Sequence, residues 1–62
     1  MELYSQEELK EALRAIVSLQ SKLGKAIEKL EPGKSQHTLA KNRLKALGIS
    51  RALLEEKLAS LQ

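Results

Sequence analysis

Apolar residues recur at spacings of three and four along two segments of the chain, at about positions 6–30 and 36–60. This spacing places apolar side chains on one side of an α-helix. Between the two segments, positions 31–35 contain a proline followed by a glycine, and both residues interrupt helices. The pattern therefore predicts an all-α fold, in which two antiparallel helices form a hairpin with its turn at 31–35.

The first helix has a defined start. Ser5 followed three residues later by Glu8 fits a capping box, in which each side chain bonds the other residue's backbone amide. The positions expected to face the second helix are Leu9, Ala12, Ile16, Leu19, Leu23, Ala26 and Leu30, and the residues that widen this row are Leu13, Val17 and Ile27. Such a row is typical of a coiled coil.

The second helix carries more apolar surface than one partner helix covers. We expect Ser35 to be its N-cap. Its main apolar stripe consists of Ala40, Leu44, Leu47, Leu54, Leu58 and Leu61, with Arg51 as the polar exception. A second stripe, more than 100° away around the helix, consists of Leu39, Ala46, Ile49 and Leu53. Counting outward from the turn sets Leu23 against Leu44 and Ile16 against Arg51.

The surplus stripe predicts association with another chain. A single unit of 62 residues, spanning 1–62 and containing no cysteine, supports only a marginal core, and pairing is a common remedy. We expect a homodimeric four-helix bundle, with a different protein partner or a monomer as the alternatives. The residues expected at the interface are Leu39, Ala46, Ile49, Leu53, Leu13 and Val17.

Basic residues concentrate in the second half of the chain. Positions 32–62 carry a net charge of +4, and the segment from Lys34 to Arg51 contains no acidic residue. Such a segment could contact phosphate groups of nucleic acid or of a membrane surface; the alternative is a solvated face that keeps a leucine-rich protein soluble. The candidate phosphate contacts are Lys34, Lys41, Arg43, Lys45 and Arg51.

Enzymatic chemistry is not expected. His37 lies close to Ser35 and Thr38 in the sequence, but the chain has no aspartate to complete a catalytic triad. Without cysteine, and with one histidine, it offers no metal site, and we expect no cofactor.

No apolar run exceeds three residues, so we expect neither a membrane span nor a signal peptide and place the protein in the cytoplasm.

Two resemblances bear on function. Residues 46–58 resemble the helix-turn-helix of Fis-type bacterial DNA-binding proteins, which implies a turn at Gly48 and a recognition helix after Ser50. Glu55 and Glu56 depart from this pattern because carboxylates repel phosphates. The basic segment and this motif make a nucleic-acid-binding regulator the alternative function.

The longer resemblance centres on Ser35-Gln36-His37-Thr38 and extends along most of the chain, through 4–16 and 29–47. Here the sequence is similar to a group of very short, uncharacterised proteins of Firmicutes-type bacteria. The resemblance implies an intact helical hairpin and no assigned activity. Our main expectation is therefore a small non-enzymatic interaction protein that associates with itself or with another protein.

Overall fold

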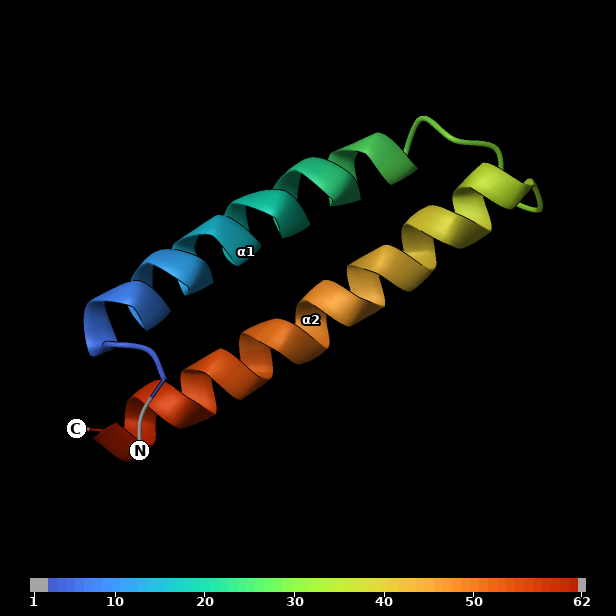
Figure 1. Ribbon diagram of the computed structural model, residues 1–62. Helices are drawn as coiled ribbons and strands as arrows, with labels where there is room; N and C mark the ends of the chain where they lie inside the picture. Colours follow the sequence, from blue (N-terminus) through green and yellow to red (C-terminus); the bar gives the residue numbers. More distant parts are fainter. Residues whose placement is uncertain (1–2, 62) are drawn as a thin grey trace.

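The computed structural model describes residues 3–61 and consists of two long antiparallel helices. Helix α1 spans Gln6–Ile27 and helix α2 spans Ser35–Leu61. The helices lie side by side and are joined by a short turn, so that both chain ends lie at the opposite end from the turn (Figure 1). The molecule measures 44 × 16 × 16 Å. The predicted all-α hairpin is confirmed.

The capping box at the start of α1 is also confirmed. The Ser5 hydroxyl oxygen accepts a hydrogen bond from the Glu8 amide at 3.1 Å, and a Glu8 carboxylate oxygen accepts one from the Ser5 amide at 3.1 Å. These bonds satisfy two amides that have no partner inside the helix.

Helix α1 ends at Ile27, earlier than the predicted Leu30, because its final turn tightens. The Lys29 amide donates to the Ala26 carbonyl at 3.1 Å, and the Leu30 amide donates to the Ile27 carbonyl at 3.0 Å. Bonds to the third preceding residue are common where a helix ends. Pro32 disfavours helical geometry at the residue before it, so the chain leaves the helix ahead of Glu31.

The turn itself follows from Pro32 and Gly33. The Lys34 amide donates to the Glu31 carbonyl at 3.2 Å, and Gly33 has a φ of +87°. Proline at the second position and a positive φ at the third are the features of a type II turn.

Ser35 is the first residue of α2 and not its N-cap, since the Lys34 carbonyl already accepts a hydrogen bond from the Thr38 amide at 3.2 Å.

Between the helices runs a row of half-buried and buried side chains, which we call the seam. In α1 it comprises Gln6, Leu9, Leu13, Ile16, Gln20, Leu23, Gly24 and Ile27, and it continues with Leu30 after the helix; in α2 it comprises His37, Ala40, Leu44, Leu47, Gly48, Leu54 and Leu58. The prediction was wrong for Ala12, Leu19 and Ala26 in α1 and for Leu61 in α2, which are exposed. It assigned Leu19 to the seam, whereas the structure has Gln20 there.

Gln20 fits the seam because α2 offers it space and a polar partner. Its side-chain oxygen accepts a hydrogen bond from Arg51 Nη1 at 3.2 Å, and Arg51 Nε donates to Glu55 Oε1 at 3.3 Å. The Gln20 amide nitrogen lies 3.7 Å from where a Cβ on Gly48 would be. Arg51 therefore contacts α1 about one turn from Ile16, the partner that counting from the turn assigned to it.

The core of the hairpin is thin. Among residues 3–61 only Ala40 and Leu58 are buried, and no side chain there is fully enclosed. The chain exposes 5055 Å² to solvent. A compact monomer of its mass of 6.9 kDa is expected to expose only about 4000 Å². The hairpin thus leaves roughly 1000 Å² more surface in water than a compact protein of this size.

Candidate functional site

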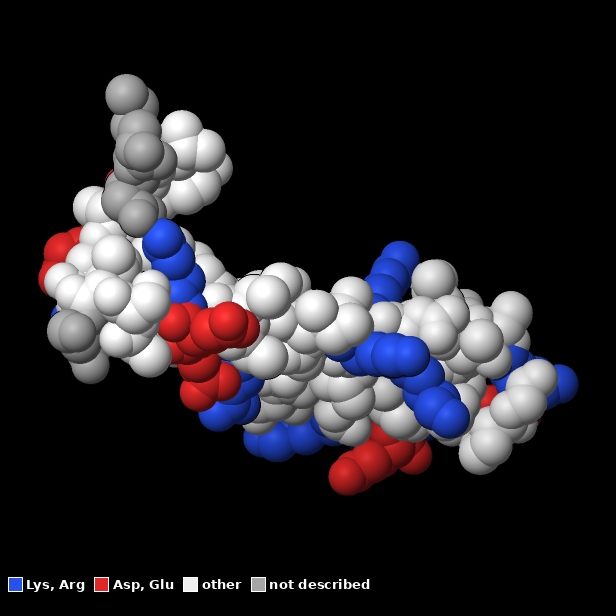
Figure 2. Space-filling view, turned by 90° about the horizontal axis from the view of Figure 1, so that it is seen from below, with Lys and Arg blue, Asp and Glu red and all other residues white. Residues whose placement is uncertain are grey.

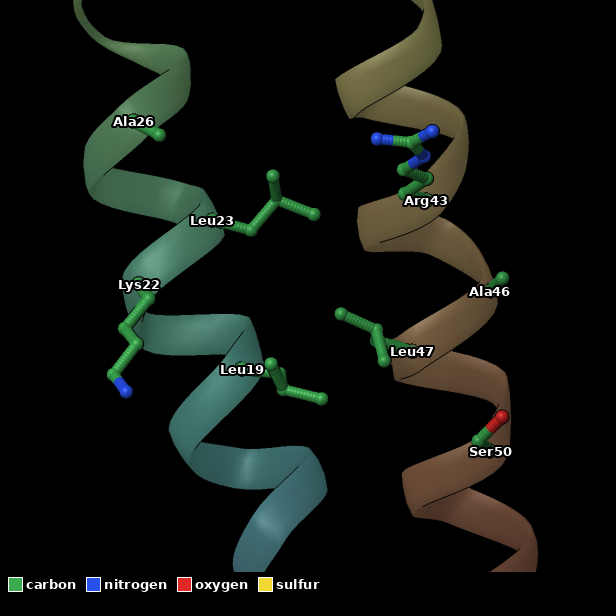
Figure 3. A pocket seen from close by; sticks show the side chains of 8 residues that line it. All are labelled: Leu19, Lys22, Leu23, Ala26, Arg43, Ala46, Leu47 and Ser50. Carbon is green, nitrogen blue, oxygen red and sulfur yellow. The ribbon is translucent and has the colours of Figure 1, made fainter.

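An open groove lies on one side of the hairpin, nearer the turn than the chain ends. It has a volume of about 560 Å³. Figure 3 shows Leu23 and Leu47 pointing into the space between the helices. The residues lining the groove are Leu19, Lys22, Leu23 and Ala26 from α1, and Arg43, Ala46, Leu47 and Ser50 from α2.

The groove continues as an apolar surface along the same side of both helices. Residues seven apart lie two helical turns apart on one side. Ala12 therefore extends the row of Leu19 and Ala26, and Leu39 and Leu53 extend the row of Ala46 in both directions. Ile49 follows Ala46 by three residues and lies at the outer edge. We call this surface the apolar face: Ala12, Leu19, Ala26, Leu39, Ala46, Ile49 and Leu53.

Every large side chain of the apolar face is well exposed. Leu19 is 50 % exposed, Leu39 49 %, Ile49 54 % and Leu53 60 %. The small side chains of Ala12, Ala26 and Ala46 between them would let another helix approach closely. A contiguous surface of this kind on a small protein is typical of a binding site.

Four of the six predicted interface residues lie together on the apolar face, namely Leu39, Ala46, Ile49 and Leu53. The other two lie elsewhere. Leu13 is half-buried in the seam, and Val17 lies beyond the seam on the flank opposite Leu19, because two residues turn a helix by about 200°. Sequence reasoning missed Leu19, Ala12 and Ala26 as surface residues, since it used them to build the seam.

Cations border the groove. Lys22 and Arg43 both line it, and the lining contains no acidic side chain. Helix geometry separates the remaining candidate phosphate contacts. Lys34, Lys41 and Lys45 lie within about 40° of one another, whereas Arg43 is about 200° from Lys41. Arg51 is occupied by Gln20 and Glu55. The five predicted residues do not form one patch.

His37 is half-buried beside the turn, where it lines a hollow of about 270 Å³ with Leu30 and Lys34. Residues 3–61 contain no cluster of histidine and carboxylate side chains able to hold a metal ion. Neither helix is long and apolar enough to span a membrane.

Residues 46–58 form part of one continuous helix. Helix α2 passes through Gly48 without a turn, and in residues 3–61 only Gly33 has a positive φ. A helix-turn-helix requires the chain to leave the helix near Gly48. The local resemblance to Fis-type proteins is therefore not accompanied by their geometry in this structure.

Comparisons with family models, with curated proteins and with solved structures gave no match to this chain.

Proposed function

We propose that this protein is a small, non-enzymatic interaction module that associates with a second copy of itself through the apolar face. The single observation that carries this proposal is the surplus of roughly 1000 Å² of exposed surface over that of a compact monomer. A stable protein–protein interface buries about 800 Å² on each partner. The surplus therefore matches what one partner would cover.

The dimensions of the apolar face support the same conclusion. One long side of the molecule measures 44 × 16 Å, a footprint of about 700 Å², which is close to a standard interface area. Two hairpins packed on these sides give a four-helix bundle, in which each helix gains a second neighbour. The exposed stripe of α2 is then buried as the core of the bundle.

The mass of the protein in solution tests this proposal. Light scattering on a sizing column at tens of micromolar should give about twice the monomer mass of 6.9 kDa. Replacing Leu39 and Leu53 by glutamate (L39E with L53E) should return the monomer mass, because carboxylates would have to be buried. The matched control replaces Ala52 and Ala59 by glutamate, on the other side of α2, and should keep the dimer. A wild-type monomer at this concentration contradicts the proposal.

A second candidate function, nucleic-acid binding, is supported by the column of Lys34, Lys41 and Lys45 on the side of the hairpin away from the apolar face. These side chains are exposed and no acidic residue lies between them in the sequence. Fluorescence anisotropy with mixed DNA or RNA should show binding that weakens steeply as salt rises from low to physiological concentration. The absence of binding at low salt excludes this function.

A further inference from the structure

The charges of the hairpin are unevenly distributed along its length. The half that contains the turn, residues 19–48, holds seven Lys and Arg and two Glu, a net charge of +5. The remaining positions, at the end with the chain termini, hold four Lys and Arg and six Glu, a net charge of −2. On the face shown in Figure 2, where the turn is to the right, Lys and Arg dominate the charged surface of that end. Each molecule is therefore positive at the turn and negative at the other end.

Two symmetric arrangements can stack one hairpin on the apolar face of another. With the two-fold axis along the helices, both turns lie at the same end and α1 packs on the partner's α2. With the axis across the helices, the turns lie at opposite ends and α1 packs on the partner's α1. Both bury the apolar face, so burial alone does not choose between them.

The distribution of charge favours one of the two arrangements. With the turns at the same end, the two turn halves, each with a net charge of +5, would lie on each other. Lys22 of each copy would then lie close to Arg43 of the other. Turns at opposite ends place each positive half on a negative half. At physiological salt, interactions fall off within about 8 Å, so facing halves count and the distant ends hardly matter. Like charges brought together at an interface are strongly disfavoured.

The apolar residues fit the second arrangement as well. Leu19 and Ile49 lie near the middle of α1 and α2, so a two-fold axis across the middle brings each close to its own copy. Leu53 of one molecule then lies near Ala46 of the other, which pairs a large side chain with a small one. From this geometry we infer that two copies pair with their turns at opposite ends. The inference rests on the proposed function and specifies its partner and orientation.

Spin labels on introduced cysteines measure the orientation directly, because the chain has no cysteine of its own. At a rise of 1.5 Å per residue, labels on Gln36→Cys near the two turns should be about 40 Å apart. A label on Gln36→Cys in one copy and on Ser60→Cys in the other should be within about 20 Å, since Ser60 lies at the opposite end of α2. Both positions are exposed.

The possible results separate the orientation from the association. A distance under about 20 Å between two Gln36→Cys labels overturns the orientation and leaves self-association standing. A monomer mass for the labelled and unlabelled protein overturns self-association itself. A dimer mass with the long turn-to-turn distance and the short mixed distance supports both.

A charge variant gives a second readout with a different sign for each arrangement. Replacing Lys22 and Arg43, the two cations that border the groove, by glutamate (K22E with R43E) lowers the charge of the turn half to +1 and leaves every residue of the apolar face in place. With turns at opposite ends the attraction between facing halves weakens, and the dissociation constant should rise several-fold. With turns at the same end the repulsion is relieved and the dissociation constant should fall. Both side chains are exposed in the hairpin, so we expect the fold to be preserved. A fall overturns the inference.

Discussion

The two helices of the hairpin bury similar seams but differ in what they leave exposed. In α1 the apolar residues gather on one side, and its exposed large ones, Leu19 and Val17, directly flank the seam. In α2 they are spread around the helix, and Leu39, Ile49 and Leu53 are about half exposed or more. One neighbour covers most of the large apolar side chains of α1, whereas it leaves Leu39, Ile49 and Leu53 of α2 exposed. The proposed self-association would therefore bury mainly side chains of α2.

The largest expected effect on stability comes from replacing a buried leucine of α2, and the comparison is with an exposed leucine of the same helix. Leu58 is 8 % exposed and Leu53 is 60 % exposed. Leu58→Ala should lower the free energy of unfolding by about 2–3 kcal/mol, because the cavity opens inside the seam. This loss should appear at every protein concentration, measured by urea unfolding followed by circular dichroism.

Leu53→Ala should behave differently because, under the proposed self-association, the contacts of the Leu53 side chain form only in the dimer. In dilute, monomeric protein its cost should be below about 0.5 kcal/mol, as for other surface substitutions. At concentrations where the dimer forms, the cost should rise to about 1–2 kcal/mol. A cost for Leu53→Ala that does not change with concentration would remove the distinction between the seam and the apolar face.

The first residues of the two helices also differ, and here the expected effects on stability are smaller. Ser5 caps α1 through its bond to the Glu8 amide, so Ser5→Ala should cost about 1 kcal/mol of stability. Ser35 is already inside α2, and Ser35→Ala should change stability by less than about 0.5 kcal/mol. Thermal unfolding of the two variants gives the difference. An equal loss in both would show that Ser35 also acts as a cap.

The sequence was sufficient to predict the two helices, the turn and the capping box because each depends on local signals. Pro32 and Gly33 determine the turn, and Ser5 with Glu8 determines the start of α1. The seam of α1 was predicted less well. Hydrophobicity favours Leu19 over Gln20, and the interaction that places Gln20 in the seam joins it to Arg51, 31 positions away.

The candidate site was predicted in part for the same reason. The stripe of Leu39, Ala46, Ile49 and Leu53 follows from the period of α2 alone, and the structure places these four residues on one side. The contribution of α1 was missed because Leu19 and Ala26 had been assigned to the seam. Only the rotation of α1 about its axis decides that assignment, and this rotation depends on packing against α2. The uneven distribution of charge along the hairpin likewise becomes apparent only when the turn brings residues 19–48 together.

Replacing Gly48 by alanine should have the smallest effect on stability, but the sign of this effect distinguishes two conformations of α2. Glycine inside a helix costs up to about 1 kcal/mol relative to alanine, and Gly48 has no positive φ. An added Cβ would lie 3.7 Å from the Gln20 amide nitrogen, which is ordinary contact. Gly48→Ala should therefore stabilise the protein by about 0.5–1 kcal/mol in thermal unfolding. If α2 instead bent at Gly48 with a left-handed backbone, as a helix-turn-helix requires, the same substitution would destabilise it, because alanine is strained at a positive φ. The sign of this one change thus separates a continuous α2, with its long apolar face, from a broken one.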